Sequence, residues 1–223
     1  MRKVLLMIAL VGCGGDSNSP DAAPMPDGRP VLALDCATYC TTIATNCTAA
    51  NTQYADANHC MATCAKFTPG TQADTGGQNT LGCRIYHAQN AMVTGMPDVH
   101  CPHAGPAGAA ISMATPQPAV CGDACTSFCT LEISICGSID APITGAPAQY
   151  QNLAACQTAC GNFNKSKPLV AGATNSSGDS LACRLYHTTN AAITGNATLH
   201  CPHTGPNGGT AAATCMTGTP PAP

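Results

Sequence analysis

Apolar side chains are sparse along this chain and gather in short stretches. The longest uninterrupted apolar run, residues 4–11, is too short to cross a bilayer. Farther on, stretches rich in Ala and Thr carry Cys at C-x3-C spacing, which places two side chains one turn apart on a helical face. Asp35 can cap the first such stretch. The pattern predicts a mainly α fold, with helices over 35–48, 54–66, 80–93, 124–137, 149–162 and 180–193.

The predicted helices form two groups of three because the sequence is a tandem repeat. From residue 83 the copies run at a constant offset of 100: GCRIYHAQNA (82–91) matches ACRLYHTTNA (182–191), and HCPHAGPAG (100–108) matches HCPHTGPNG (200–208). We therefore expect two small disulfide-rich, three-helix modules with long Pro/Gly loops. Their predicted bounds are 35–121 and 122–215, between a flexible tether (13–34) and a disordered tail (216–223).

The composition indicates that covalent cross-links hold the modules together. Leu, Ile, Val and Phe make up only 31 of the 223 residues, whereas 17 are Cys. A core this small favours a disulfide scaffold, and the even number of Cys in each repeat favours bonds within a module. The alternative, a thiolate metal cluster, typically shows C-x2-C pairs, and the sequence has none. With only 8 Lys and Arg and a net charge of −3, we expect no nucleic-acid partner.

The N-terminus has the features of a secretory signal: Arg2 and Lys3, the apolar run, and then small residues. Its end, LVGC (10–13), resembles the lipobox of bacterial lipoprotein precursors. The resemblance implies that a signal peptide, residues 1–12, is removed and that Cys13 is lipidated. It also implies an outer-membrane location, because Gly14 follows Cys13 where Asp would direct retention at the inner membrane. The alternative is a plain secreted protein in which Cys13 is incidental.

A pair of antiparallel helices that each carry C-x3-C resembles the α-hairpinin arrangement, in which outer Cys pairs with outer and inner with inner. The resemblance implies Cys36–Cys64 and Cys40–Cys60. Cys47 then lies at the far end of the first helix, within reach of Cys101, which leaves Cys83–Cys121. Eight Cys allow 105 connectivities, so this pairing is one choice among many. For the second module the same scheme pairs Cys125–Cys160, Cys129–Cys156, Cys136–Cys201 and Cys183–Cys215.

Histidines are the candidate metal ligands. Six of the seven occupy matched positions in the two repeats: His87, His100, His103, His187, His200 and His203. In each copy H-x2-H falls in a predicted loop, while the remaining His lies on a helix one turn after a Cys. Three imidazoles per module suit Zn²⁺ or Cu²⁺, with backbone carbonyls, Asn or Tyr holding the rings. The alternative is structural, with each His bonded to a loop carbonyl or a helix end.

A polar stripe beside the histidines is a candidate binding groove: Arg84, Tyr86, Asn90, Arg184, Tyr186 and Asn190. The alternative is a packed Tyr with an Arg that bonds a loop carbonyl. We expect no enzyme. Glu132 is the only Glu, so an acid pair for glycoside hydrolysis has no support. No G-x-S-x-G or H-E-x-x-H motif occurs, and the pairing of Cys leaves no free nucleophile.

The tandem C-x3-C modules with C-R-x-Y-H and H-C-P-H-x-G-P motifs resemble Cys-rich, tandem-repeat predicted lipoproteins of Gram-negative bacteria. That resemblance implies a location and no activity. We therefore expect a lipid-anchored cell-envelope protein that acts as a non-catalytic binding or structural scaffold for a protein or an envelope polymer. The alternative function is Zn or Cu binding through a His triad in each module, with or without metal-dependent catalysis.

Overall fold

A computed structural model describes residues 29–111, 120–169, 175–208 and 214–215. The predicted signal peptide, Cys13, most of the predicted tether and the predicted tail lie outside these ranges. Within them, every helix is too short or too polar to cross a membrane.

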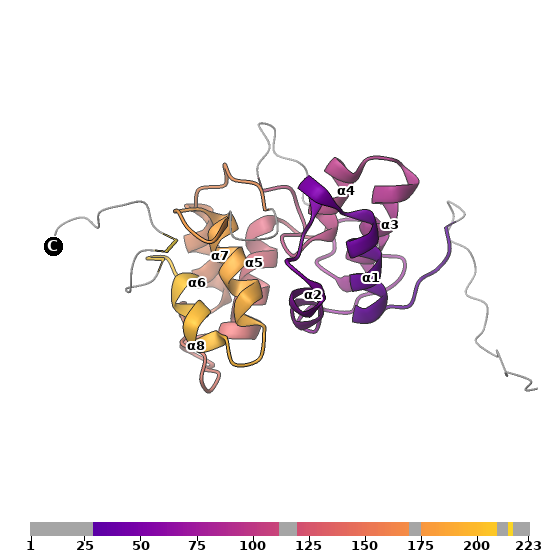
Figure 1. The fold of residues 1–223 in the computed structure, drawn as a ribbon. Helices are drawn as coiled ribbons and strands as arrows, with labels where there is room; N and C mark the ends of the chain where they lie inside the picture. The colour runs from indigo at the N-terminus through magenta and orange to yellow at the C-terminus, as the bar shows by residue number, and fades with distance from the viewer. Residues whose placement is uncertain (1–28, 112–119, 170–174, 209–213, 216–223) are drawn as a thin grey trace, which may run out of the picture. The chain divides into compact units, whose positions relative to one another are not determined.

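The first module contains four α-helices and a short 3-10 turn, coloured indigo to magenta in Figure 1. Asp35, Asp56 and Thr80 each cap a helix by accepting a hydrogen bond from the backbone N–H three residues on. The first helix packs against the second and the third, and the third packs against the fourth. These elements are α1 (Cys36–Asn46), η1 (Ala49–Asn51), α2 (Ala57–Cys64), α3 (Leu81–Val93) and α4 (Pro97–Ala104).

The second module also has four α-helices among its described residues, but its 3-10 turn follows the fourth helix; it is coloured pink to yellow in Figure 1. Asp123, Asn152 and Ser180 cap its first three helices. Within the described residues every named element is a helix, which confirms the mainly α fold. The elements are α5 (Ala124–Cys136), α6 (Leu153–Gly161), α7 (Leu181–Ala191), α8 (Ala197–His200) and the 3-10 turn η3 (Cys201–His203).

Each module has a fourth α-helix, which corrects the expectation of three helices per module and the expected placement of the H-x2-H motif. We expected the H-x2-H motif in a loop, but His100 and His103 both lie on α4. Pro97 at the first turn is pre-organised for a helix start, since its missing N–H has no helical partner there. The helix has no apolar stripe that could reveal it, and Pro102 inside it argues against a helix. Packing against α3 and the disulfide at Cys101 hold it in place.

The apolar cores are small and include the disulfide sulfurs. Tyr54 and Tyr150 are buried in them, at 8% and 3% exposure. Leu32 and Leu34 pack against the first core, so the folded part begins before residue 35, within the segment expected to be a flexible tether.

Eight disulfides join the helices, four within each module, and their Cα atoms lie 5.6 to 5.8 Å apart. In α1 and α2, Cys36 bonds Cys64 and Cys40 bonds Cys60, as the α-hairpinin resemblance implies. Each bond contributes about 2–4 kcal/mol, chiefly by restricting the unfolded chain. The other six bonds also join the pairs named from the sequence: Cys47–Cys101, Cys83–Cys121, Cys125–Cys160, Cys129–Cys156, Cys136–Cys201 and Cys183–Cys215.

Candidate metal centre

The three histidines of the first module meet where α3 packs against α4. His87, on α3, places its Nδ1 atom 3.0 Å from Nδ1 of His100 on α4. Its Nε2 atom lies 3.1 Å from the backbone carbonyl oxygen of Thr75. The His103 ring lies 5.1 Å from the His87 ring, centroid to centroid. One nitrogen from each of the three rings can be chosen so that all lie within 4.8 Å of one another.

His103 is the unusual member of this cluster. It is only 4% exposed, and neither of its ring nitrogens has a hydrogen-bond partner. Leaving a buried polar group unpaired costs about 1–3 kcal/mol, so such groups call for an explanation. A bound cation is one explanation, because a neutral imidazole nitrogen is a metal ligand.

The backbone sets the tautomer of His87. A carbonyl oxygen can only accept, so Nε2 of His87 carries the proton and donates it to Thr75. Nδ1 of the neutral ring then carries the lone pair and is the acceptor in the contact with Nδ1 of His100. Metal-bound His commonly donates its other N–H to a carbonyl in this way. Two nitrogens bound to one tetrahedral Zn²⁺ at about 2.0–2.1 Å lie roughly 3.3 Å apart, close to the distance seen here.

Burial keeps the His103 ring neutral. Burial lowers the pKa of His103 to about 4, and the neighbouring His100 acts in the same direction. The ring is therefore unprotonated at neutral pH, and no proton competes with a metal ion for its lone pairs.

The second module has a similar arrangement around His187. Its Nδ1 atom lies 2.9 Å from Nδ1 of His200, and its Nε2 atom lies 3.1 Å from the carbonyl oxygen of Ser176. The His203 ring is 4.7 Å from the His187 ring. Burial lowers the pKa of His187 to about 4, although the hydrogen bond to Ser176 opposes that shift.

Disulfide sulfurs adjoin both clusters but are not free ligands. In the first module the Sγ atoms of Cys83 and Cys121 lie within 4.8 Å of a His87 nitrogen. The same relation joins Cys183 and Cys215 to His187. Because these sulfurs are bonded to each other, they offer no thiolate, and thiolate is the form that binds metal.

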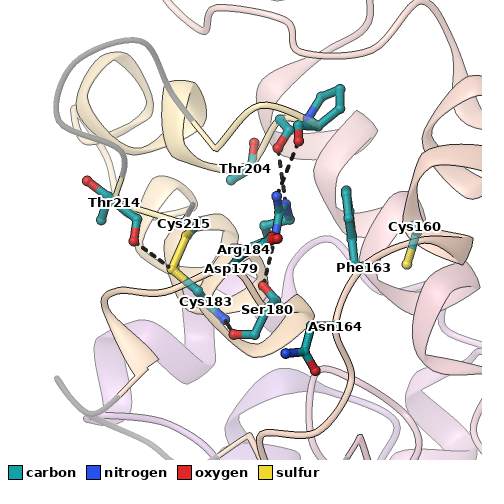
Figure 2. Close-up of polar contacts among 12 residues, drawn as sticks. Cys160, Phe163, Asn164, Asp179, Ser180, Cys183, Arg184, Thr204, Thr214 and Cys215 are labelled. Carbon is teal, nitrogen blue, oxygen red and sulfur yellow. Dashed lines mark hydrogen bonds and ion pairs between the residues drawn. A yellow bond between two sulfur atoms is a disulfide. The ribbon is translucent and has the colours of Figure 1, made fainter. Parts of the chain in front are cut away.

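The arginines at matched positions of the two repeats lie in the core and do not line a groove, which corrects the binding-groove hypothesis for these two residues. Arg84 and Arg184 are 0% and 1% exposed. In Figure 2 Arg184 lies beside the Phe163 ring, and its guanidinium carbon is 3.8 Å from the ring centroid. Its Nε donates to the Gly205 carbonyl oxygen at 3.1 Å, and one terminal nitrogen pairs with Asp179 at 2.8 Å. No side of this guanidinium is open to a ligand.

Arg84 is held in the same way. It stacks over Phe67 at 4.1 Å and donates from Nε to the Gly105 carbonyl oxygen at 3.2 Å. This matches the alternative we gave for the arginine, a bond to a loop carbonyl. The rest of the predicted stripe lies on α3 and α7. Tyr86 and Tyr186 are half-buried with their rings 5.1 Å from His87 and His187, Asn90 is buried, and Asn190 donates to the carbonyl oxygen of Tyr186.

Sequence reasoning missed a buried polar triad in the second module. Glu132 is 0% exposed, and its carboxyl oxygens accept hydrogen bonds from Thr188 at 3.0 Å and Thr204 at 2.6 Å. Aligning the repeats would have revealed it, since all three positions are apolar in the first module. The matching residues there are Ile43, Ala88 and Ala104.

Fold and site together define a class: tandem helical modules, each cross-linked by four disulfides and each with a histidine cluster. The chain belongs to the family described as the BfoA family C-terminal domain, whose model matches residues 30–116 and 119–217. The two matches confirm the tandem repeat, one for each module. Cys121 falls in the second match, but its bond to Cys83 ties it to the first module. No curated protein and no solved structure matches the chain.

Proposed function

We propose that this protein binds a transition-metal ion, Zn²⁺ or Cu²⁺, through His87, His100 and His103 of the first module. The observation that carries the proposal is the buried His103 ring, which lies against the other two and has no hydrogen-bond partner. Three neutral imidazoles leave a fourth position for water. The absence of carboxylates from this ligand set favours Zn²⁺ or Cu²⁺ over Mg²⁺ or Ca²⁺.

The structural alternative explains less of this geometry. A His that serves as a hydrogen-bonding spacer uses its nitrogens on neighbouring groups, as His87 does with Thr75. His103 uses neither nitrogen, although both are buried. A cation at the cluster would bind the nitrogen that carries the lone pair and offset part of the cost of burying the ring.

The role we propose is binding and not catalysis. The first module has a cavity of about 260 Å³, lined by α1, α2 and the segment between them, with Ile43 and Tyr54 in its wall. None of the three histidines lines it, so a substrate held there would not meet the ion. For this reason we limit the proposal to binding.

We further propose that the modules are displayed at the cell envelope on a lipid anchor at Cys13, with a non-catalytic scaffold role as the competing function. The LVGC motif at residues 10–13 supports the anchor. Eight disulfides suit the oxidising environment outside the cytoplasm. Replacing Cys13 by Ser should move the protein from the membrane fraction to the soluble fraction, and an unchanged membrane fraction would contradict the anchor.

Metal binding is tested by stripping the purified, oxidised protein with a chelator and adding back Zn²⁺ or Cu²⁺. Native mass spectrometry with elemental analysis then counts the ions. His103→Ala should lose one ion relative to the wild type. The control His59→Gln changes a histidine outside the first cluster, whose Nε2 atom lies 3.1 Å from Oδ1 of Asn190, and it should retain the ion of the first module. A wild type that binds no ion, or a His103→Ala protein that binds as many as the wild type, would leave the scaffold as the better function.

A further inference from the structure

We infer that the second module holds a second, weaker site for the same kind of ion at His187, His200 and His203. This inference rests on the proposed function of the first module. It adds that one chain binds two ions, the second at a higher concentration of free ion than the first. The family match does not assign this site, and the nitrogens of these three histidines do not all lie within 4.8 Å of one another, as those of the first module do.

Two of the three ligands are arranged as in the first module. His187 and His200 face each other through their Nδ1 atoms at 2.9 Å, against 3.0 Å for His87 and His100. The Nε2 atom of His187 is held by a backbone carbonyl, that of Ser176. Because a carbonyl and not a side chain holds the ring, the loop sequence can diverge between the copies without loss of this tautomer.

The third ligand is where the two sites differ. His203 lies on the 3-10 turn η3, whereas His103 lies on the α-helix α4. Residues three apart eclipse one another in a 3-10 helix but are offset in an α-helix, so the His203 ring leaves the backbone in another direction relative to His200. Its ring is nevertheless close to His187, at 4.7 Å, and its Nδ1 atom is buried without a hydrogen-bond partner.

The geometry therefore describes a two-imidazole site with a third ligand close by. Among the described residues, nitrogens that all lie within 4.8 Å of one another form a three-histidine group only in the first module. Completing the second site requires the half-buried His203 side chain to turn and become fixed. Immobilising one such side chain lowers affinity by up to about tenfold, so we expect the second ion to bind roughly tenfold more weakly.

The test is a titration of the full oxidised chain with Zn²⁺ alone, followed by calorimetry and by native mass spectrometry. The wild type should take up two ions in two steps about tenfold apart. His203→Ala should remove the weaker step, His103→Ala the tighter step, and the double variant both. Circular dichroism and the intact disulfide mass check that each variant is folded. Because the His203 side chain is only half-buried, we expect the His203→Ala protein to fold, so that a lost ion reports lost binding.

The outcomes distinguish the two claims. Two ions bound by His203→Ala, a single ion bound by the wild type, or two steps of equal affinity would overturn this inference. In each of these cases loss of an ion with His103→Ala would still support the proposed function. No ion bound by the wild type would overturn both.

Discussion

The buried carboxyl of Glu132 gives the second module a stability that depends on pH. Burial raises the pKa of Glu132 to about 7, although hydrogen bonds from the hydroxyls of Thr204 and Thr188 act in the opposite direction. Each hydroxyl also lies within 2.9 Å of a backbone carbonyl oxygen. A protonated carboxyl can donate to one hydroxyl, which then donates to its carbonyl, so the neutral acid satisfies more of these groups than the carboxylate does.

The sign of the effect follows from linkage. The pKa of Glu132 is higher in the folded state than its ordinary value of 4.5, so the folded protein holds a proton that the unfolded chain releases. The contribution of Glu132 to the free energy of unfolding is therefore fully present below pH 4.5 and decreases as the pH rises through 7. At about 1.4 kcal/mol for each unit of pKa, the loss amounts to about 3 kcal/mol between pH 4 and pH 8.

Glu132→Gln removes the titration while keeping an amide that can donate to a threonine hydroxyl. Guanidinium denaturation of the oxidised wild type and variant at pH 4 and pH 8 measures the difference. We expect the variant to unfold at a higher denaturant concentration than the wild type at pH 8 and to match it closely at pH 4. Equal pH dependence in the two proteins, or a wild type that gains stability relative to the variant as the pH rises, would refute the reasoning.

Three further predictions follow from the packing. Arg84→Lys should lower the free energy of unfolding by about 2–4 kcal/mol in guanidinium denaturation, because Lys cannot reproduce the fork of donors or the stacking on Phe67; a loss below 1 kcal/mol would contradict this role. Tyr39→Phe should cost about 1–3 kcal/mol, because it removes the hydroxyl that pairs with both the buried Tyr54 hydroxyl at 2.9 Å and the Ala104 carbonyl oxygen at 2.7 Å; an unchanged free energy of unfolding would contradict this role. The intact mass of the oxidised chain should rise by about 16 Da on full reduction, two hydrogens for each of the eight bonds, and a smaller rise would contradict the pairing.

The helices that carry the C-x3-C pairs and their caps were predictable because their signals are local. A C-x3-C pair lies on one helical face wherever it occurs in a helix, and Asp35 caps α1 through a hydrogen bond that spans three residues. The repeat added longer-range information, since a bond pattern that suits one copy must also suit the other. The weakly patterned α4 was not predictable, because packing against α3 and not its own sequence makes it a helix.

The sequence by itself determined which residues compose the candidate site: six histidines at matched positions, four disulfides in each module, and an arginine beside every cluster. It could not separate a ligand from a structural residue, because that depends on what lies opposite each side chain in space. Only the tertiary structure directs Arg84 into the core, toward the Gly105 carbonyl, and leaves both nitrogens of the buried His103 without a partner. The physical reason is that hydrogen-bond satisfaction is settled between segments distant in sequence, whereas helix spacing and capping are settled within a few residues.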